Sequence, residues 1–267
     1  MAGALTLGPA CEYESGLSCL DVVSQGSAVH LLSDRTRQAA ERSGPAGAPA
    51  DEPLVLPYTR WIWDRMDRDL GPDAAVLFVG GGGYGLPARL LASRPRATAT
   101  AVEIDPLVTR VVRDRLPWAG GWLAREGGPG GRLTVVHADG RVFLNEGRDR
   151  FDAAVMDAFS SGAVPAHLAT RETYDHLRAR VDGPVYVNLL DRPDGPLVRG
   201  VHAILRDAYP HLRAVTGPSG PDGMTNTVLA ASPRPLPPLP ALPDGYAPAA
   251  IAPARAFTDD RGWIGHR

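Results

Sequence analysis

The stretch that decides the fold is VLFVGGGGYG, residues 76–85, in which an apolar run passes into a loop made almost entirely of glycine. A short apolar run that ends in glycine is typical of a strand buried on both faces. Gly80, Gly82 and Gly85 fit the spacing G-x-G-x-x-G, which removes side chains where a ligand approaches the backbone at the start of a helix. Simple strand-to-helix turns also use glycine, so the loop alone leaves both interpretations open. The loop contains no acidic residue, and that absence needs a physical reason.

The sequence around this loop, from about residue 74 to 216, repeats the order strand, glycine or acidic turn, helix. Such alternation predicts an α/β fold, with a parallel sheet covered by helices on both faces. The expected strands cover residues 76–79, 98–104, 133–136, 153–156, 185–190 and 213–215, and the expected helices lie near 86–94, 106–115, 166–180 and 195–209. A last strand over 226–231 is expected to close the edge of this sheet.

The flanking segments have different patterns. Residues 11–40 alternate apolar and polar positions, which predicts a β-hairpin or small antiparallel sheet. A Pro/Gly/Ala linker over 44–53 and an amphipathic helix over 58–70 are expected to follow. The proline-rich segment 233–248 predicts an extended strap. We therefore expect three parts: a small N-terminal β-domain with its linker (1–53), a Rossmann-like domain (54–232) and a proline-rich C-terminal strap (233–267).

Composition excludes several classes of protein. The formal net charge of −2 and a pI near 6.4 give no attraction to nucleic acid or to a membrane surface. All 28 basic residues are arginine, so pyridoxal-phosphate enzymes and Walker-type nucleotide hydrolases, which need a lysine, are excluded. Cys11 and Cys19 lack metal-ligand or redox spacing, and we expect free thiols in a cytoplasmic protein. The histidines are scattered, so we expect no metal site.

Two acidic residues follow the next two expected strands. Glu103, in TAVEIDP, lies about 20 residues beyond the glycine loop, where a carboxylate can accept hydrogen bonds from both ribose hydroxyls. Asp139, in HADG, could accept from an adenine amino group while Gly140 lets the backbone lie close to the ring. Asp139 could equally be a helix cap. With the loop, these residues indicate an adenosine-containing ligand and leave dinucleotide and sulfonium compounds both open.

The segment AAVMDAFSSGAVPAHLATRETY, residues 153–174, places Asp157 at the end of the fourth strand. This segment and the motifs before it resemble the spermidine synthase-like family of aminopropyltransferases, over roughly residues 11–232. The resemblance implies a seven-stranded, methyltransferase-type Rossmann sheet behind a small N-terminal β-domain. It also implies an S-adenosylmethionine or decarboxylated S-adenosylmethionine donor, no metal, an amine acceptor and a homodimer. By the same resemblance, Asp157 orients or deprotonates the attacking amine.

Several family positions differ in this chain. Where the family's glycine loop carries an aspartate this chain has Gly83, followed by Tyr84. Ser160 stands where the synthases commonly have a second diamine-binding aspartate. Tyr58 matches a family tyrosine, but Arg60 replaces the glutamate that follows it. Because burying a dicationic diamine requires paired carboxylates, these changes argue against putrescine.

We therefore predict a transferase that alkylates an amine, with Asn188 on the acceptor side. S-adenosylmethionine is the favoured donor, because its own carboxylate could bind the backbone N–H groups of an acid-free loop. The alternatives are an authentic polyamine aminopropyltransferase using decarboxylated S-adenosylmethionine, an NAD-dependent oxidoreductase and a non-catalytic adenosyl-binding module. His167 is expected on a helix surface, and the FTDD element at 257–260 is expected to dock near the mouth of the site.

Overall fold

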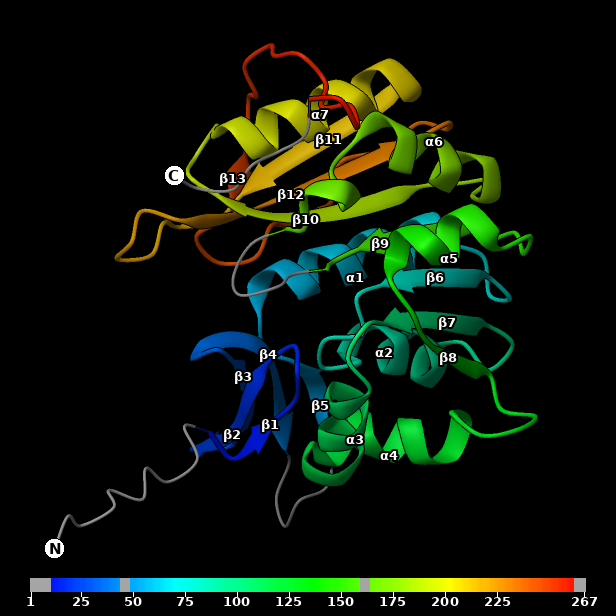
Figure 1. Cartoon of the computed structure of the whole chain (residues 1–267), viewed down its shortest axis with the longest axis vertical. Helices are drawn as coiled ribbons and strands as arrows, with labels where there is room; N and C mark the ends of the chain where they lie inside the picture. Colours follow the sequence, from blue (N-terminus) through cyan, green and yellow to red (C-terminus); the bar gives the residue numbers. More distant parts are fainter. Residues whose placement is uncertain (1–10, 44–48, 159–163, 262–267) are drawn as a thin grey trace, which may run out of the picture.

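The computed structural model describes residues 11–43, 49–158 and 164–261. The chain forms two sheets, a larger one with helices on both faces and a smaller antiparallel one built from the N-terminal residues. Figure 1 shows the smaller sheet (blue) below the larger sheet, beside the end of it that carries β7 and β8. The predicted α/β fold with a separate N-terminal β-sheet is confirmed.

The larger sheet has the strand order β13-β11-β12-β10-β9-β6-β7-β8. Its strands are β6 (Ala75–Val79), β7 (Thr98–Glu103), β8 (Leu133–His137), β9 (Ala153–Met156), β10 (Val185–Asp191), β11 (His211–Thr216), β12 (Thr225–Ser232) and β13 (Ala247–Pro248). Strands β8, β7, β6, β9 and β10 run parallel, whereas β12 is antiparallel to both β10 and β11. The expectation that residues 226–231 close the sheet edge is wrong: β12 is almost wholly buried and lies between β10 and β11.

The helices cover the two faces in two groups. They are α1 (Pro57–Asp69), α2 (Gly85–Ser93), α3 (Pro106–Arg115), α4 (Pro117–Glu126), α5 (Gly140–Glu146), α6 (Arg171–Arg180) and α7 (Pro196–Ala208). Alternate strand residues point to opposite faces, so Val76 and Phe78 join one core while Leu77 and Val79 join the other. The first core contains side chains of α1 to α4 and the N-terminal sheet, and the second contains those of α5 to α7.

Helix prediction differs from the structure in two respects. The helix expected near 166–180 is interrupted: a 3₁₀ turn covers Ala166–Leu168, and α6 begins only at Arg171. Helices α4 and α5 were not predicted. Helix α4 follows α3 directly and contains two glycines, so its helical pattern is weak in the sequence. Helix α5 is only seven residues long, which gives little periodicity to detect.

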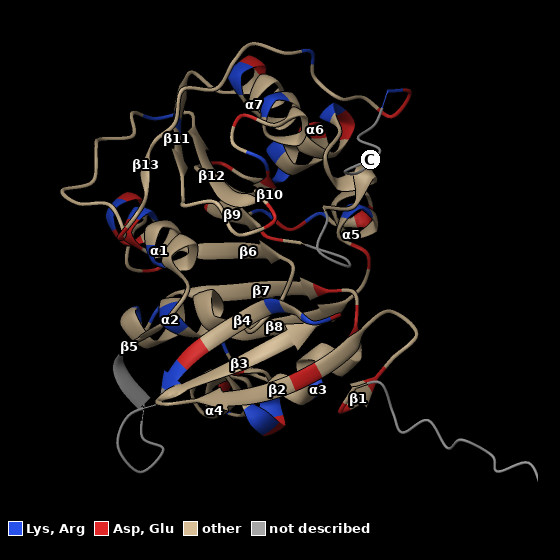
Figure 2. Ribbon diagram, turned by 90° about the vertical axis from the view of Figure 1, so that its left-hand side faces the viewer, with Lys and Arg blue, Asp and Glu red and all other residues tan. Residues whose placement is uncertain are grey.

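The smaller sheet has the order β1-β2-β3-β4-β5, with every neighbouring pair antiparallel. Its strands are β1 (Tyr13–Glu14), β2 (Cys19–Gln25), β3 (Ala28–Ser33), β4 (Thr36–Ser43) and β5 (Pro49–Leu54). The linker predicted over 44–53 is therefore wrong in part, because its second half pairs with β4. Proline is tolerated there because β5 is an edge strand. Figure 2 shows this sheet packed beside α2 and α4.

The two cysteines contradict the expectation of free thiols, since Cys11 and Cys19 form a disulfide. Pairing of β1 with β2 places Glu14 opposite Cys19, and the chain before β1 brings Cys11 back to the same place. The two Cα atoms are 5.6 Å apart, a usual separation for a disulfide. Sequence spacing missed this bond because the strand pairing brings the two residues together.

The proline-rich C-terminal segment is held against α1 and the larger sheet. Arg65 Nη1 donates to the Pro237 carbonyl oxygen at 2.5 Å, and Arg213 Nε donates to that of Leu236 at 2.8 Å. Strand β13 then adds to the sheet edge beside β11. Among the described residues, no helix combines the length and apolar character needed to cross a bilayer.

Candidate active site

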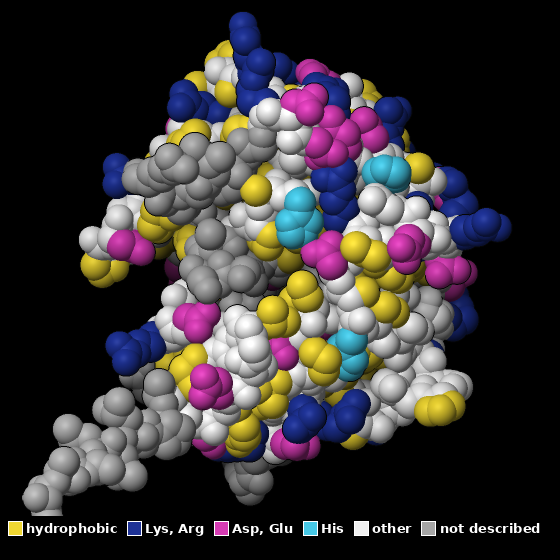
Figure 3. Space-filling view, viewed as in Figure 1, with side chains coloured by type: hydrophobic (Ala, Val, Ile, Leu, Met, Phe, Trp, Pro, Cys, Tyr) yellow, Lys and Arg dark blue, Asp and Glu magenta, His cyan; other side chains and the backbone are white. Residues whose placement is uncertain are grey.

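Two adjoining cavities lie at the carboxyl ends of β6, β7, β8 and β9. The larger cavity has a volume of about 370 Å³ and is lined mainly by the ends of these strands, by residues 164–168 and by the N-terminal residues Leu17 and Ser18. The smaller cavity, of about 60 Å³, lies between the glycine loop, α1 and the N-terminal sheet. Gln38, Gly80 and Asp157 line both cavities. Figure 3 shows hydrophobic, acidic and histidine side chains around a hollow near the middle of this face.

Glycine is required in the loop by close backbone contacts. Gly80 has a φ of +97°, and a Cβ atom there would lie 2.2 Å from the carbonyl oxygen of Asp157. A Cβ atom at Gly83 would lie 2.3 Å from the Cβ of Ala39 on β4. The loop is therefore pressed between the end of β9 and the N-terminal sheet, where side chains at these two positions would clash.

Glu103 supplies the acidic group that the glycine loop lacks. Its Oε2 accepts hydrogen bonds from the N–H groups of Gly81 and Gly82 at 2.9 and 3.2 Å, and its Oε1 accepts from Asp105 N–H at 2.9 Å. Burial raises the pKa of Glu103 more than these three hydrogen bonds lower it. The carboxyl group lines the larger cavity, at the position expected for a ribose acceptor.

Asp139 is both a helix cap and a wall of the larger cavity. Its Oδ1 accepts from the N–H groups of Arg141 and Val142 at 2.8 and 3.1 Å, and its Oδ2 lies 2.7 Å from His167 Nε2. Burial would raise the pKa of Asp139, but the backbone N–H groups and the His167 ring outweigh it, and that pKa is lowered. Gly140 packs against Val79, where a Cβ atom would lie 2.5 Å from Val79 Cγ1.

Asp157 lies at the junction of the two cavities and is held by two polar side chains. Tyr58 donates its hydroxyl hydrogen to Oδ2 at 3.2 Å, and Asn188 Nδ2 donates to Oδ1 at 2.9 Å. Asn226 in turn donates to Asn188 Oδ1 at 3.0 Å, which fixes the Asn188 amide. Burial raises the pKa of Asp157, and the hydrogen bonds from Asn188 and Tyr58 oppose this effect without cancelling it. The predicted grouping of Tyr58, Asn188 and Asp157 is thus present.

The N-terminal sheet contributes residues that the sequence did not reveal. Gln38 and Glu41 on β4 both line the smaller cavity. Glu41 is only 3% exposed, and its carboxylate accepts from the N–H groups of Trp118 and Ala119 at 2.7 and 3.0 Å. Burial raises the pKa of Glu41, although these two N–H groups lower it. Only docking of the sheet brings β4 to the site, so no local pattern could have identified these residues.

Three other predicted residues have different outcomes. Tyr84 lines the smaller cavity but is only 1% exposed; its hydroxyl lies 2.7 Å from Thr109 Oγ1, and its ring packs against Gly81. Arg60, on α1, lines neither cavity. The argument that Arg60 adds positive charge to the acceptor site is therefore not supported. Ser160 lies outside the described residues.

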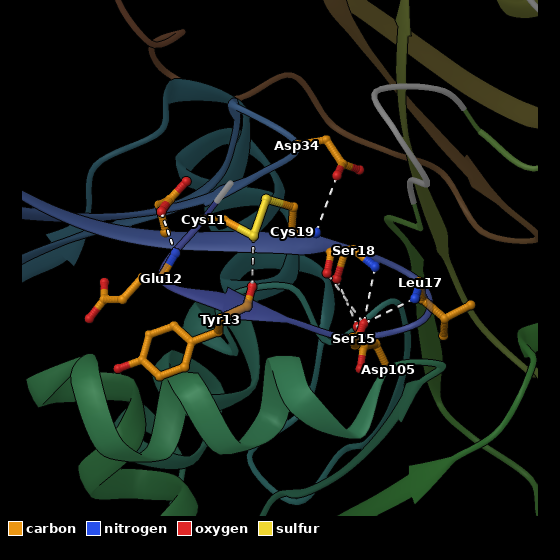
Figure 4. Close-up of a disulfide and its surroundings, with 10 residues drawn as sticks. Cys11, Glu12, Tyr13, Ser15, Leu17, Ser18, Cys19, Asp34 and Asp105 are labelled. Carbon is orange, nitrogen blue, oxygen red and sulfur yellow. Dashed lines mark hydrogen bonds between the residues drawn. A yellow bond between two sulfur atoms is a disulfide. The ribbon is translucent and has the colours of Figure 1, made fainter. Parts of the chain in front are cut away.

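The segment closed by the disulfide forms one side of the larger cavity. Ser15 and Ser18 donate their hydroxyl hydrogens to Asp105 Oδ2 at 2.6 and 2.7 Å, as Figure 4 shows. Asp105 also caps α3 through the N–H of Leu107, as its place before Pro106 predicted. Leu17, between the two serines, is 53% exposed and lines the cavity.

The larger cavity has the size and the polar groups of a small-molecule site. A cavity of about 370 Å³ falls in the range of small-molecule sites, about 300–1,000 Å³. Its carboxylates, Glu103 and Asp139, can accept from hydroxyl and amino groups. Among the described residues, no group of three or more His, Cys, Asp or Glu side chains is arranged to hold a metal ion.

Comparison with known proteins finds polyamine aminopropyltransferases in sequence, and spermidine synthases and a methyltransferase-like protein in fold. No protein-family model matches the chain. A polyamine aminopropyltransferase from Vibrio vulnificus is 27% identical over 127 residues, which span 46% of this chain and 39% of that protein. A probable spermidine synthase from Corynebacterium glutamicum superposes with a TM-score of 0.74 at 18% identity, covering 94% of this chain and 97% of that one. A spermidine synthase solved with the transition-state analogue AdoDATO gives 0.65 at 20% identity, covering 83% and 72%.

Proposed function

We propose that this chain, a spermidine synthase-like protein by sequence similarity and fold, transfers an alkyl group from an adenosyl sulfonium donor to an amine held beside Asp157. The observation that carries this proposal is the position of Asp157 at the junction of two cavities. The larger cavity is large enough for a nucleoside and is lined by the carboxylates of Glu103 and Asp139. The smaller cavity extends from Asp157 toward the N-terminal sheet. A group-transfer reaction needs such a junction, because donor and acceptor must meet at one point.

In the larger cavity, Glu103 would hold the ribose hydroxyls and Asp139 the adenine amino group. Both carboxylates retain acceptor capacity beyond the hydrogen bonds that fix them, since an ionised carboxylate has about four lone-pair sites. Backbone N–H groups hold each of these side chains in place, so ligand binding does not have to order them. The close packing of Gly140 on Val79 leaves a wall without a side chain against which a flat base can lie.

At the junction, Asp157 would orient the amine and accept its proton. Tyr58 and Asn188 fix the two carboxylate oxygens, so the acceptor nitrogen meets a carboxylate whose direction is already set. The raised pKa of Asp157 makes it a stronger base than an exposed aspartate. When bound, the sulfonium supplies a carbon that is already attached to a good leaving group. The protein's remaining task is to align the amine with that carbon and to exclude water.

The aminopropyl donor, decarboxylated S-adenosylmethionine, is the first candidate. Curated relatives that match part of the chain are polyamine aminopropyltransferases, and one fold neighbour was solved with AdoDATO. The sequence favours intact S-adenosylmethionine because an acid-free loop could bind its carboxylate through backbone N–H groups. The structure weakens this preference, because the N–H groups of Gly81 and Gly82 already donate to Glu103.

Methyl transfer from intact S-adenosylmethionine is the second candidate, and one observation favours it. No carboxylate at Gly83 is available for the donor's aminopropyl ammonium, and a side chain there would collide with Ala39. The acceptor also remains open, because nothing in the comparisons excludes putrescine. Among the described residues, the acids that line the smaller cavity are Asp157 and Glu41, and Glu41 accepts from two N–H groups of α4.

A ligand-binding experiment separates these candidates. Thermal unfolding of the purified chain should be followed with S-adenosylmethionine, its decarboxylated form, 5′-methylthioadenosine and NAD. We expect all three adenosyl compounds to stabilise the chain, with the largest shift for the true donor. Turnover with that donor and a panel of mono- and diamines, including putrescine, then identifies the acceptor. Stabilisation by NAD alone would overturn the proposed class, and binding without turnover across the panel would favour a non-catalytic adenosyl-binding module.

A further inference from the structure

The C-terminal FTDD segment is joined to the wall of the larger cavity by a defined set of contacts. Asp259 makes a two-pronged ion pair with Arg141, with Nη1–Oδ1 and Nη2–Oδ2 distances of 2.6 and 2.5 Å. We name this pair the C-terminal clasp. Arg141 belongs to the first turn of α5, directly after Asp139 and Gly140. The clasp therefore connects a segment about 120 residues further along the chain to the proposed adenine site.

The segment carrying Asp259 is itself held in place. The carbonyl oxygen of Phe257 accepts from Arg171 N–H at 2.9 Å, and Asp259 N–H donates to Glu172 Oε2 at 3.0 Å. The Phe257 ring fills the space over Gly200 of α7, where a Cβ atom would lie 2.0 Å from Phe257 Cε2. The backbone that carries Asp259 is therefore held by contacts with α6 and α7. The bidentate ion pair then fixes the orientation of the Arg141 guanidinium.

Arg141 in turn lies against the turn that carries His167. Its Nη1 is 3.5 Å from the carbonyl oxygen of His167 and 3.4 Å from Thr170 Oγ1. The His167 ring then reaches across the cavity wall to Asp139 Oδ2, at 2.7 Å. Asp139 and His167 both line the larger cavity. Asp259 therefore contacts Arg141, and Arg141 contacts the 3₁₀ turn through the carbonyl group of His167. The His167 ring contacts Asp139 Oδ2, the carboxylate oxygen that does not take part in the cap of α5.

We propose that Asp259 is a positioning residue for base recognition: through Arg141 it holds His167 and Asp139 in the arrangement that selects the amino group of adenine. This inference rests on the proposed function. Because Asp139 Oδ1 is engaged by the helix cap, Oδ2 is the oxygen on which an adenine N–H would bond, and His167 sets its direction. A base with a carbonyl group at the same position would place oxygen against oxygen and be rejected.

The test compares 5′-methylthioadenosine with 5′-methylthioinosine by isothermal titration calorimetry; the inosine compound has a carbonyl group in place of the 6-amino group, and its N1 carries a hydrogen. The unchanged chain should bind the adenosine compound more tightly. Asp259→Asn should weaken binding of the adenosine compound roughly threefold to tenfold and leave the inosine compound nearly unaffected, so that selectivity falls. Asp259→Glu should restore most of the selectivity. Asp260→Asn, at the neighbouring exposed acid, is the matched control and should behave like the unchanged chain.

A second variant keeps the test valid if Asp259→Asn does not fold. Arg141→Gln should reduce selectivity to the same extent, and adding Asp259→Asn to it should change nothing further, because the two residues act through one contact. Unchanged selectivity in these variants, or equal weakening of both nucleosides, would overturn the positioning role. If the unchanged chain binds neither nucleoside, the proposed function itself fails and this inference fails with it.

Discussion

At the residue scale, the chemistry depends on Asp157 and the two groups that fix it. The carboxylate has one oxygen toward Tyr58 and the other toward Asn188, and burial raises its pKa. Burial and its contact with Asp157 raise the pKa of Tyr58 well above the usual value, so its hydroxyl stays protonated and can only donate to Asp157. The arrangement keeps a partly desolvated base in one orientation at the junction of the cavities.

Asp157→Asn should lower kcat by roughly 10²- to 10⁴-fold, the usual contribution of a general base. Binding of 5′-methylthioadenosine should change by less than about twofold, because Asp157 is not one of the residues assigned to the nucleoside. Tyr58→Phe is the comparison variant, and its smaller loss would reflect orientation alone. Equal kcat for Asp157→Asn and the unchanged chain would remove the base assignment.

The pH dependence of kcat/KM provides an independent measurement on the same residue. Because the pKa of Asp157 is raised, its ionised form is present above that pKa, and activity should fall as the pH drops through it. The acidic limb should therefore lie above the ordinary aspartate value of about 4. Asp157→Asn should abolish this limb in the residual activity. An unchanged acidic limb in the variant would assign it to another group.

At the element scale, the ends of the parallel strands and the N-terminal loop together form the larger cavity. The strand ends contribute Glu103 and Asp139, and the loop closed by the Cys11–Cys19 disulfide contributes Leu17 and Ser18. Two serine hydroxyls attach this loop to Asp105, the cap of α3. One wall of the proposed donor site therefore depends on the disulfide, although neither cysteine lines the cavity.

Replacing both cysteines by serine should weaken binding of 5′-methylthioadenosine and lower the free energy of unfolding by up to about 2–3 kcal/mol, as expected for opening a short loop. Calorimetry and denaturant unfolding measure the two effects. A reducing agent should reproduce them in the unchanged chain and have no effect on the variant. Equal affinity with and without the disulfide would show that the loop does not shape the site.

Thiol labelling of the chain as isolated also tests the expected cytoplasmic location, since disulfides are rare in the cytoplasm.

At the scale of the whole molecule, the site exists only because the N-terminal sheet docks on the larger domain. Glu41 reaches from β4 to the start of α4 and accepts from two backbone N–H groups that no side chain of α4 itself caps. The Ala39 methyl group fits the space left at Gly83. These contacts bring Gln38 and Glu41 to the wall of the smaller cavity.

Glu41→Gln should destabilise the chain by about 1–3 kcal/mol near pH 5, because the amide nitrogen that replaces one carboxyl oxygen cannot accept from the N–H group that it faces. Burial raises the pKa of Glu41, so the unchanged chain loses stability as the pH rises from about 4 through that pKa, whereas the variant does not. The difference in unfolding free energy between the unchanged chain and Glu41→Gln should therefore become smaller toward pH 8. Glu14→Gln, at an exposed position of the same sheet, should show neither effect. A pH-independent difference would contradict the role of this buried carboxyl.

The sequence determined most of the strands and helices of the larger domain, the glycine loop and the strand-end positions of Glu103, Asp139 and Asp157. These are local properties: hydrophobic runs, glycine where the backbone turns, and acids where buried strands emerge. Because parallel strands end at the same edge, the sequence also predicted that these acids lie along one edge of the sheet. It identified Tyr58 through resemblance and Asn188 from its place at the end of an expected strand, and both contact Asp157.

Only the tertiary structure decided which groups face those acids. The disulfide, the docking of Gln38 and Glu41, the use of the loop's N–H groups by Glu103 and the clasp between Asp259 and Arg141 each join residues far apart in the chain or on different elements. Such contacts depend on how the elements pack, and residue spacing does not encode packing. For the same reason Arg60, which the sequence placed beside the acceptor, lines neither cavity.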